Sequence, residues 1–306
     1  MHYIVHIFLL YRPIVREGIY YYYYKLIERI FFMNIKYRLI DVSVHNGTID
    51  FKKVKKAGID GVIVRAGYGS STVDKNFHTN IKNALDSGLH VGVYWFGYAY
   101  STELAKKEAE YCLKVIGQYK GRLSLPVFYD WEYDSFNYAK KQGVTPTKSL
   151  VSKMTDAFCK LLEDNGYYVG VYANLDYMNR YYTNDIKTKY TIWIAQWATT
   201  CTYNGSYGIW QYGAETNKID SKYLDGISGI VDKNYCYIDY PNIITKLGFN
   251  GYKPKTSKKY TTSDLVRLKK YLLGDGSIEA TDLDINRDGK VSTADLMELK
   301  RTLKED

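Results

Sequence analysis

Short apolar runs alternate with helix-like segments along most of this chain, and this alternation limits the fold more than any other feature. Candidate strands cover 39–44, 61–66, 91–96, 126–130, 169–172, 191–195, 208–212 and 229–232. Helical spacing predicts helices over 51–57, 76–86, 103–116 and 150–165, followed by Gly58, Gly88, Gly117 and Gly166. Such alternation is typical of parallel β-α units. We therefore expect an α/β fold, in the form of a closed, TIM-like barrel. Because the later connections are too short for full helices, its last three strands would be joined by loops or hairpins, with room for antiparallel pairs.

The run 125–132, LPVFYDWE, ends in two carboxylates that are one residue apart. Side chains at i and i+2 of a strand share a face, so Asp130 and Glu132 should project the same way, with Cα atoms about 6 to 7 Å apart. Two acids in one pocket cannot both ionise freely, and a raised pKa is what a general acid needs near neutral pH. An ordinary strand end, with a turn-forming Asp and a solvated Glu, would give the same short pattern.

Polar and aromatic residues recur where the other predicted strands end. In a barrel of this type, the functional residues lie at the C-terminal strand ends. The set comprises Asp41, Arg65, Tyr94, Trp95, Asp130, Glu132, Tyr172, Asn174, Trp193, Gln196, Gln211, Tyr212 and Asp232. Singly, each has an ordinary explanation, since Asp forms turns and Trp or Tyr packs in cores. Together, carboxylates for chemistry, aromatic rings for stacking on sugars and amides for hydroxyl groups indicate a glycosidase.

Separated motifs between residues 37 and 240 carry a resemblance to a known family. They are DVS at 41–43, NGTIDF at 46–51, VRAGYG at 64–69, GVYWF at 92–96, LPV at 125–127, DWE at 130–132, WIAQW at 193–197, IWQY at 209–212 and IVDKN at 230–234. In this order they resemble glycoside hydrolase family 25, the muramidase or Chalaropsis-type lysozyme family. One departure is Phe51, where the family usually has Trp.

The resemblance implies cleavage of the β-1,4 bond between N-acetylmuramic acid and N-acetylglucosamine in peptidoglycan, without a cofactor for catalysis. It also implies a (β/α)5(β)3 barrel. By motif, Glu132 is the general acid, and Asp130, Asp41 and Asp232 are its acidic companions. The remaining residues of the set, from Arg65 to Tyr212, are expected to bind substrate.

Two mechanisms fit this resemblance. The substrate's own acetamido group can attack C1 while Asp130 orients it, or Asp232 or Asp41 can act directly as nucleophile or base. Two other functions compete with the muramidase. A chitinase-like barrel resembles D-x-x-D-x-D-x-E along this strand, but Leu125 and Phe128 occupy the first two acidic positions. A non-catalytic peptidoglycan-binding protein is the alternative from a different class.

The C-terminal tail contains a repeat. The segment 260–272 recurs at 291–303, and each copy predicts an amphipathic helix. The spacing of an EF-hand-type loop before the second helix predicts one structural Ca²⁺ site, made by Asp284, Asn286, Asp288, Lys290 through its carbonyl, Ser292 and Asp295. An acidic turn that caps the helix is the plainer alternative. In the first copy the matching positions are Lys253, Lys255 and Ser257, so that loop should not bind calcium.

The two loop-helix copies resemble a dockerin, which implies a cohesin-type scaffold protein as partner, although a wall-targeting appendage is an alternative. We therefore expect a catalytic muramidase barrel over 33–250, a linker over 251–259 and a dockerin-like module over 260–306. Residues 1–32 fit a signal peptide poorly and their apolar run is too short to span a bilayer, so Met33 is the expected natural start and no stable membrane insertion is expected.

These features point to action in the extracellular space or the cell wall, reached by secretion or by lysis after accumulation in the cytoplasm. The formal charge of +9 favours polyanionic partners, but the chain lacks an Arg/Lys block, so nucleic acid is not expected. Cys112, Cys159, Cys201 and Cys236 lie far apart and are expected to be free thiols.

Overall fold

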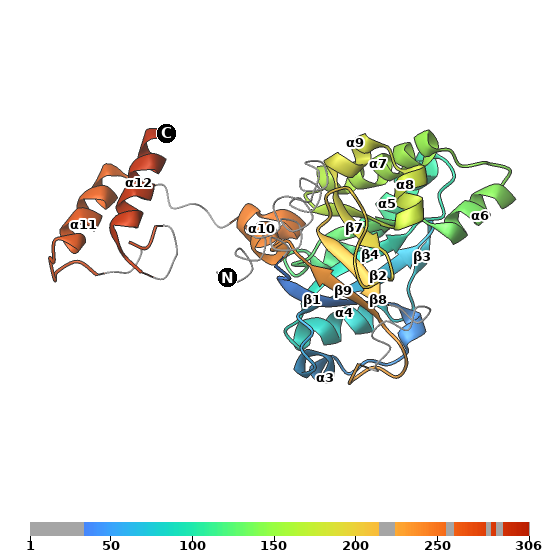
Figure 1. Cartoon of the computed structure of the whole chain (residues 1–306), viewed down its shortest axis with the longest axis horizontal. Helices are drawn as coiled ribbons and strands as arrows, with labels where there is room; N and C mark the ends of the chain where they lie inside the picture. The colour runs from blue at the N-terminus through green and yellow to red at the C-terminus, as the bar shows by residue number, and fades with distance from the viewer. Residues whose placement is uncertain (1–33, 214–223, 255–259, 280–282, 286–289, 306) are drawn as a thin grey trace, which may run out of the picture. The chain divides into compact units, whose positions relative to one another are not determined.

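The computed structural model describes residues 34–213, 224–254, 260–279, 283–285 and 290–305 (Figure 1). The chain divides into two compact units between Pro254 and Lys255. The expected upstream extension, 1–32, lies outside the described residues. In the part of the chain that the structure describes, no helix is both long enough and apolar enough to cross a membrane.

The first unit is a barrel. Its strands are β1 (Tyr37–Val42), β2 (Gly61–Tyr68), β3 (Thr72–Val73), β4 (His90–Phe96), β5 (Val127–Asp130), β6 (Val169–Asn174), β7 (Thr191–Ala195), β8 (Ile209–Gly213) and β9 (Asp232–Cys236). The sheet order is β1-β9-β8-β7-β6-β5-β4-β2-β3, and β1 also pairs with β2, so every strand but the short edge strand β3 joins a closed ring. The expected TIM-like barrel is confirmed, and β9 runs antiparallel to both of its neighbours.

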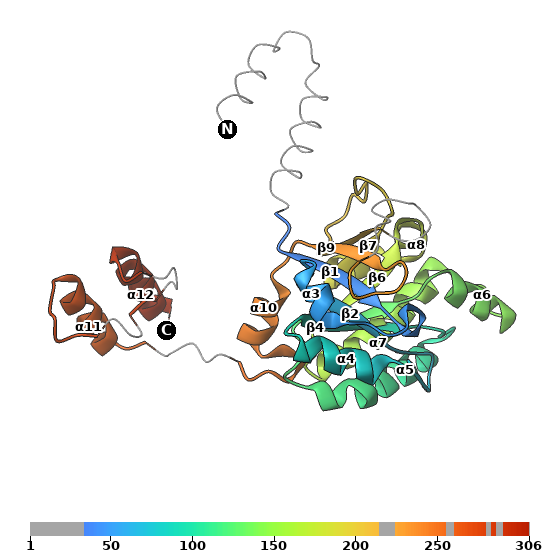
Figure 2. The same ribbon diagram turned by 90° about the horizontal axis from the view of Figure 1, so that it is seen from below.

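Helices lie around the outside of the strands, and α6 stands out at the edge of the barrel in both views (Figures 1 and 2). They are α3 (Phe51–Lys56), α4 (Phe77–Asp86), α5 (Thr102–Ile116), α6 (Tyr133–Lys141), α7 (Lys148–Asp164), α8 (Leu175–Tyr181), α9 (Asn184–Lys189) and α10 (Tyr240–Leu247). The four predicted helices correspond to α3, α4, α5 and α7. Gly58, Gly88 and Gly166 follow three of them with positive φ, whereas Gly117 has a φ of −55° and continues into a 3-10 turn.

The last predicted strand is misplaced. The apolar pair Ile230 and Val231 suggested a strand over 229–232, but β9 begins at Asp232 and runs to Cys236. The strand was missed because its sequence, DKNYC, is largely polar. Its inward-facing Asn234 is 1% exposed yet fully hydrogen-bonded to neighbouring side chains, so burial here does not require an apolar residue.

Side chains alternate between the two sides of the barrel wall. Leu39, Ile63 and Phe128 belong to a buried cluster inside the barrel. Their strand neighbours, such as Val127 and Tyr129, belong to a larger cluster that includes residues of the surrounding helices. This period of two fixes which residues near the strand ends can face the barrel opening.

The end of the barrel where β5 and β6 begin is closed by the last part of the first unit. Tyr240 and Ile244 of α10 pack in the inner cluster. Beyond α10, the fully buried Asn250 donates from Nδ2 to the carbonyls of Leu123 (2.8 Å) and Leu125 (3.1 Å). Its Oδ1 accepts from the backbone N–H of Tyr168 at 2.8 Å. The amide side chain thus ties the entrances of β5 and β6 together.

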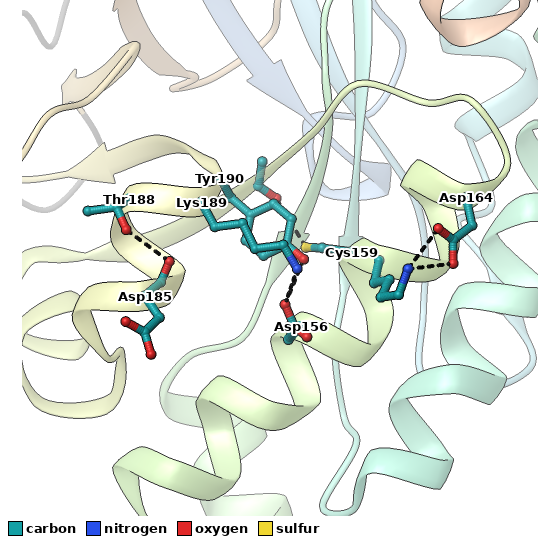
Figure 3. Close-up of polar contacts among 9 residues, drawn as sticks. Asp156, Cys159, Asp164, Asp185, Thr188, Lys189 and Tyr190 are labelled. Atoms are coloured by element: carbon teal, nitrogen blue, oxygen red, sulfur yellow. Dashed lines mark hydrogen bonds and ion pairs between the residues drawn. The ribbon is translucent and has the colours of Figure 1, made fainter.

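The outer helices are held to the barrel partly by polar contacts, as Figure 3 shows for α7 and the segment after α9. Asp156 of α7 accepts hydrogen bonds from Lys189 Nζ (2.7 Å) and from the Tyr190 hydroxyl (2.8 Å). The Cys159 thiol lies 3.9 Å from the carbonyl of Gly170, against β6. Cys112, Cys159 and Cys236 are buried free thiols, and Cys201 is partly exposed.

The second unit contains α11 (Thr262–Leu272) and α12 (Thr293–Glu305). Leu268, Leu283 and Leu299 form its buried core. Leu268 and Leu299 hold equivalent positions in the two sequence repeats, so each copy buries the same position of its helix. The repeated pattern therefore predicts the contact between α11 and α12 correctly.

Candidate active site

Four acidic residues come together at one end of the barrel. Asp41 lies near the end of β1, Asp130 ends β5, Glu132 precedes α6 and Asp232 begins β9. All four line one cavity of about 390 Å³. Asp232 reaches this end because β9 runs antiparallel, so that its first residue pairs with Asp41.

The segment from β5 into α6 is held in place on both sides. Asp130 accepts a hydrogen bond at its carbonyl from the backbone N–H of Gly97 (2.7 Å). Trp131 points away from the cavity into the outer core, where its Nε1 donates to the carbonyl of Ala99 (3.1 Å). The Glu132 backbone N–H donates to Ser135 Oγ at 3.1 Å. With Trp131 turned outward and both neighbours extended, Asp130 and Glu132 line the same cavity, the arrangement expected for i and i+2.

A buried network orients Asp41. Its Oδ2 accepts from Asn234 Nδ2 (2.8 Å) and from Gln211 Nε2 (3.0 Å). Asn234 in turn accepts from Trp193 Nε1 at 2.7 Å. Gln211 Oε1 accepts from the Tyr172 hydroxyl (3.1 Å) and from Trp197 Nε1 (3.0 Å). The network fixes the orientation of both side-chain amides. The oxygen of each one accepts from an indole N–H, which can only donate, namely that of Trp193 for Asn234 and that of Trp197 for Gln211.

Burial raises the proton affinity of the acid cluster. Desolvation raises the pKa of Asp41 to about 6, although hydrogen bonds from Asn234 and Gln211 oppose it. Desolvation, and then the charges of Asp134 and Asp41, raises the pKa of Glu132 to about 7. Desolvation and the neighbouring Glu132 and Asp41 charges raise the pKa of Asp130 well above its usual range, while Arg65 lowers it. The cluster therefore holds a proton near neutral pH, and the apparent pKa values belong to the cluster as a whole.

Glu132 and Asp130 differ in ways that bear on their roles. Glu132 is partly exposed, whereas Asp130 is 4% exposed. The Oδ1 atom of Asp130 is buried and makes no hydrogen bond to any residue that the structure describes. A buried carboxylate oxygen without a donor is costly, and a ligand that brings an N–H group to it would remove that cost.

Arg65 supplies a fixed positive charge beside the acids. Its Nε lies 2.7 Å from Asp74 Oδ2, and its side chain is 13% exposed. Asp74 also accepts from the backbone N–H of Val44 at 3.1 Å, so the carboxylate that holds Arg65 is itself anchored. The guanidinium thus lines the cavity in one orientation.

The structure brings most of the predicted set together. Besides the four acids, the cavity is lined by Arg65, Tyr94, Tyr172, Trp193 and Gln211. Further lining residues were not predicted, namely Ser43, His45, Asn46, Phe96, Trp197 and Ile230. All of these except His45 lie within the family-like motifs, so motif membership was the available signal for the other five.

Four predicted substrate-binding residues do not line this cavity. Trp95 is fully buried among the outer helices and donates from Nε1 to the carbonyl of Gly69. Tyr212 also packs against the outer cluster and stacks on Tyr235 at 4.1 Å. The amide of Gln196 bonds to Thr202 (2.9 Å), and Asn174 Oδ1 caps α8 by accepting from the Tyr177 N–H (2.9 Å).

In the second unit, the expected calcium loop is described only in part. Asn286 and Asp288 lie outside the described residues. Asp295 is fully buried and accepts at 2.7 Å from the backbone N–H groups of both Ile285 and Ser292. Its carboxylate therefore already ties the two ends of the loop. Among the described residues, no group of three or more His, Cys, Asp or Glu side chains is arranged to hold a metal ion.

Comparison with known proteins matches both units. A family model described as glycosyl hydrolases family 25 matches residues 40–220, and one described as dockerin type I domain matches residues 257–304. Lysozyme M1 of Streptomyces globisporus is 25% identical over 201 residues, which cover 64% of this chain and 66% of that protein.

Solved structures with a similar fold include the modular autolysin LytC of Streptococcus pneumoniae, bound to a synthetic peptidoglycan ligand. It has a TM-score of 0.57 and 31% identity, and the match covers 66% of this chain but 46% of LytC. A family 25 glycosyl hydrolase of Bacillus anthracis has a TM-score of 0.56 and 25% identity, over 71% of this chain and 94% of that one. The chain thus spans less than half of LytC.

Proposed function

Because the chain belongs to family 25 of the glycosyl hydrolases, we propose that its barrel is a muramidase. Its reaction would be hydrolysis of the β-1,4 bond between N-acetylmuramic acid and N-acetylglucosamine in peptidoglycan. The observation that supports this most directly is the single cavity that Asp41, Asp130, Glu132 and Asp232 all line.

In this proposal Glu132 is the general acid. It is the more exposed member of the Asp130 and Glu132 pair, so its proton can reach a glycosidic oxygen that enters from solvent. The raised pKa keeps Glu132 protonated close to neutral pH, as protonation of a leaving group requires. Arg65, Tyr94, Tyr172, Trp193 and Gln211 would bind the sugars.

The unpartnered Asp130 Oδ1 supports participation by the substrate's acetamido group. In this mechanism the acetamido N–H donates to Asp130, and the acetamido oxygen attacks C1. The bond from C1 to the leaving oxygen breaks as Glu132 gives that oxygen its proton. Water then adds to C1 and returns a proton to Glu132, which acts as base, and the acetamido group is restored. Direct attack by Asp41 or Asp232 is the alternative, and a covalent glycosyl adduct trapped on either residue would establish it.

The test of the activity is release of new reducing ends from purified bacterial cell walls, with identification of the sugar at each end. We expect N-acetylmuramic acid ends from the native protein. Glu132→Gln should lower the rate about a hundredfold or more, because it removes the general acid. The exposed Glu110 on α5 provides a control, and Glu110→Gln should match the native rate.

Retention of the native rate by Glu132→Gln would exclude this assignment. A protein that pellets with walls but releases no reducing ends would support the non-catalytic binding function instead. Both outcomes differ from the loss that accompanies unfolding, which circular dichroism of each variant detects.

For the second unit we propose a docking module that binds one Ca²⁺ and a cohesin-type scaffold protein, supported by the dockerin match over residues 257–304. The loop from Asp284 to Asp295 would hold the ion, with Lys290 contributing its carbonyl and Asn286, Asp288 and Ser292 contributing side-chain oxygens. The enzyme would then act outside the cell, at the wall, after secretion or lysis. The proposed catalytic domain is 33–250, and the proposed linker is 251–259.

A further inference from the structure

A second cavity, of about 750 Å³, opens beside the acid cluster. It lies between the β2–β3 turn, the segment between β4 and α5, and helix α6. Four tyrosines line it, Tyr68, Tyr98, Tyr100 and Tyr138, and we call it the tyrosine cavity. Tyr68 is 36% exposed and Tyr138 is 40% exposed, so both present ring surface to solvent.

The tyrosine cavity adjoins the acid cavity along two ring contacts and one helix. The guanidinium of Arg65, which lines the acid cavity, lies 5.6 Å from the centre of the Tyr68 ring. Phe96 of the acid cavity packs against Tyr98 with 5.1 Å between ring centres. Helix α6 begins directly after Glu132 and lines the tyrosine cavity along its length. A branched ligand held at Glu132 can therefore extend into this second cavity.

The walls of the tyrosine cavity are rigid on the aromatic side. Tyr98 meets Tyr68 edge to face at 6.2 Å and meets Tyr138 edge to face at 5.2 Å. The backbone N–H of Tyr98 donates to Glu108 Oε1 at 2.7 Å, and Glu108 is 1% exposed. These contacts fix the rings before a ligand arrives, which lowers the entropic cost of binding.

Helix α6 adds two opposite charges to this aromatic surface. Asp134 and Lys141 both line the cavity and lie seven residues apart, about 10 Å along the helix axis. Both are exposed, and neither forms an ion pair with any other described residue. A glycan strand without peptides carries only the lactyl carboxylate of each N-acetylmuramic acid unit and has no group to match Asp134. The stem peptide of peptidoglycan carries carboxylates, often an amino group, and short aliphatic side chains that suit tyrosine rings.

We propose that the tyrosine cavity binds the stem peptide attached to the N-acetylmuramic acid unit, with Lys141 contacting a peptide carboxylate and Asp134 contacting an amino group or backbone N–H. This inference rests on the muramidase function proposed above. Binding of the stem peptide in the tyrosine cavity makes the enzyme prefer peptide-bearing glycan strands over strands from which an amidase has removed the peptides.

The experiment compares the two kinds of strand as substrates for Lys141→Gln and for the native protein. We expect Lys141→Gln to lower kcat/KM about fivefold to tenfold on peptide-bearing strands, the effect of one lost charge-assisted hydrogen bond. On peptide-free strands the two proteins should be equal. Lys140→Gln is the matched control, because Lys140 is exposed on the same helix and lies outside the cavity.

Asp134→Asn gives a second measurement. Each kind of strand must then be assayed across the pH range, because the Asp134 charge also raises the pKa of Glu132. If Lys141→Gln lowers kcat/KM equally on both kinds of strand, the stem-peptide proposal is overturned, and the cavity binds sugar rings instead. No effect of Lys141→Gln on either strand would also overturn it. If the native protein cleaves neither kind of strand, the muramidase function itself is overturned. This outcome differs from a failure of the stem-peptide proposal, in which the native protein still cleaves both kinds of strand.

Discussion

Asp41 and Asp232 are direct cross-strand partners, although they come from the first and last strands of the barrel. Residues in such positions have Cβ atoms about 5 Å apart, and like charges there are destabilising. The chain keeps two acids at this position nevertheless, next to Asp130 and Glu132. A purely structural role would be served better by uncharged residues, so the pairing itself supports a catalytic use of the site.

The rate of wall hydrolysis should fall as the pH rises through about 7. Glu132 must be protonated to act as an acid, and its pKa is raised to about 7, first by desolvation and then by the Asp134 and Asp41 charges. Asp134→Asn removes one of these charges and should shift the alkaline limb to lower pH. The measurement is kcat/KM on soluble glycan strands from pH 4 to 9. An alkaline limb that Asp134→Asn leaves in place would count against Glu132 as its origin.

Glu108 should make the barrel less stable as the pH rises. Desolvation raises its pKa from 4.5 to about 7, although Tyr129 and the Tyr98 and Ala99 backbone oppose the shift. The folded state then binds more protons than the unfolded state between about pH 4.5 and 7. Stability is fully present below this window and is lost as the pH rises through it, by up to about 3 kcal/mol.

The Glu108→Gln variant tests this assignment, because a neutral amide can still accept from the Tyr98 N–H. Urea unfolding at pH 5 and pH 8 should show a smaller loss of stability for the variant than for the native protein. Equal losses would mean that other buried acids, such as Asp41, set the pH dependence. Glu110→Gln, on the exposed face of α5, serves as the control.

Replacement of Asn234 by Ala should both destabilise the barrel and impair catalysis. The variant removes a donor from Asp41 and leaves Trp193 Nε1 without its acceptor. Loss of these buried hydrogen bonds should cost about 2 to 4 kcal/mol of unfolding free energy. Urea unfolding measures this cost, and the exposed Asn184 on α9 provides a matched Asn→Ala control. A change below about 0.5 kcal/mol, the size usual for surface sites, would contradict the network described here.

Calcium should stabilise the second unit without changing the chemistry of the first. We expect about one ion per chain, because only the second loop has the ligand pattern of an EF-hand-type site. Isothermal titration with calcium gives the stoichiometry, and Asp284→Ala should weaken binding at least tenfold. Asp275→Ala, at a partly exposed acid outside the loop, should leave binding unchanged. Native affinity in Asp284→Ala would favour the plainer role of the loop as an acidic turn that caps α12.

Much of the barrel could be predicted from sequence because apolar runs and glycine-terminated helices mark its β-α units. Asp41 and Asp130 follow from the strand period, since each comes two positions after an inward-facing apolar residue. Leu39 precedes Asp41, and Phe128 precedes Asp130, within the same inner face. Two of the predicted substrate-binding residues that lie outside the cavity, Trp95 and Tyr212, have a related explanation. Tyr94 faces inward, so its neighbour Trp95 must face outward, and Gln211 and Tyr212 are related in the same way.

Other features could not be read from sequence patterns. β9 is largely polar because Asn234 belongs to the Asp41 network, so its burial left no apolar signal. Helix α6 is short and largely polar, and two of its residues, Tyr138 and Lys141, face a cavity, so it left little apolar signal. The tyrosine cavity itself is assembled from segments that are distant in sequence. Only the folded barrel brings these segments together.

The direction of β9 also decides where the barrel unit ends. The strand starts beside the acids and runs away from them, and Asn250 then fixes the following segment to the entrances of β5 and β6. The chain thus leaves the first unit on the side remote from the acid cluster. Whatever follows Pro254 can therefore be gained, lost or exchanged without rebuilding the cavity that the four acids line.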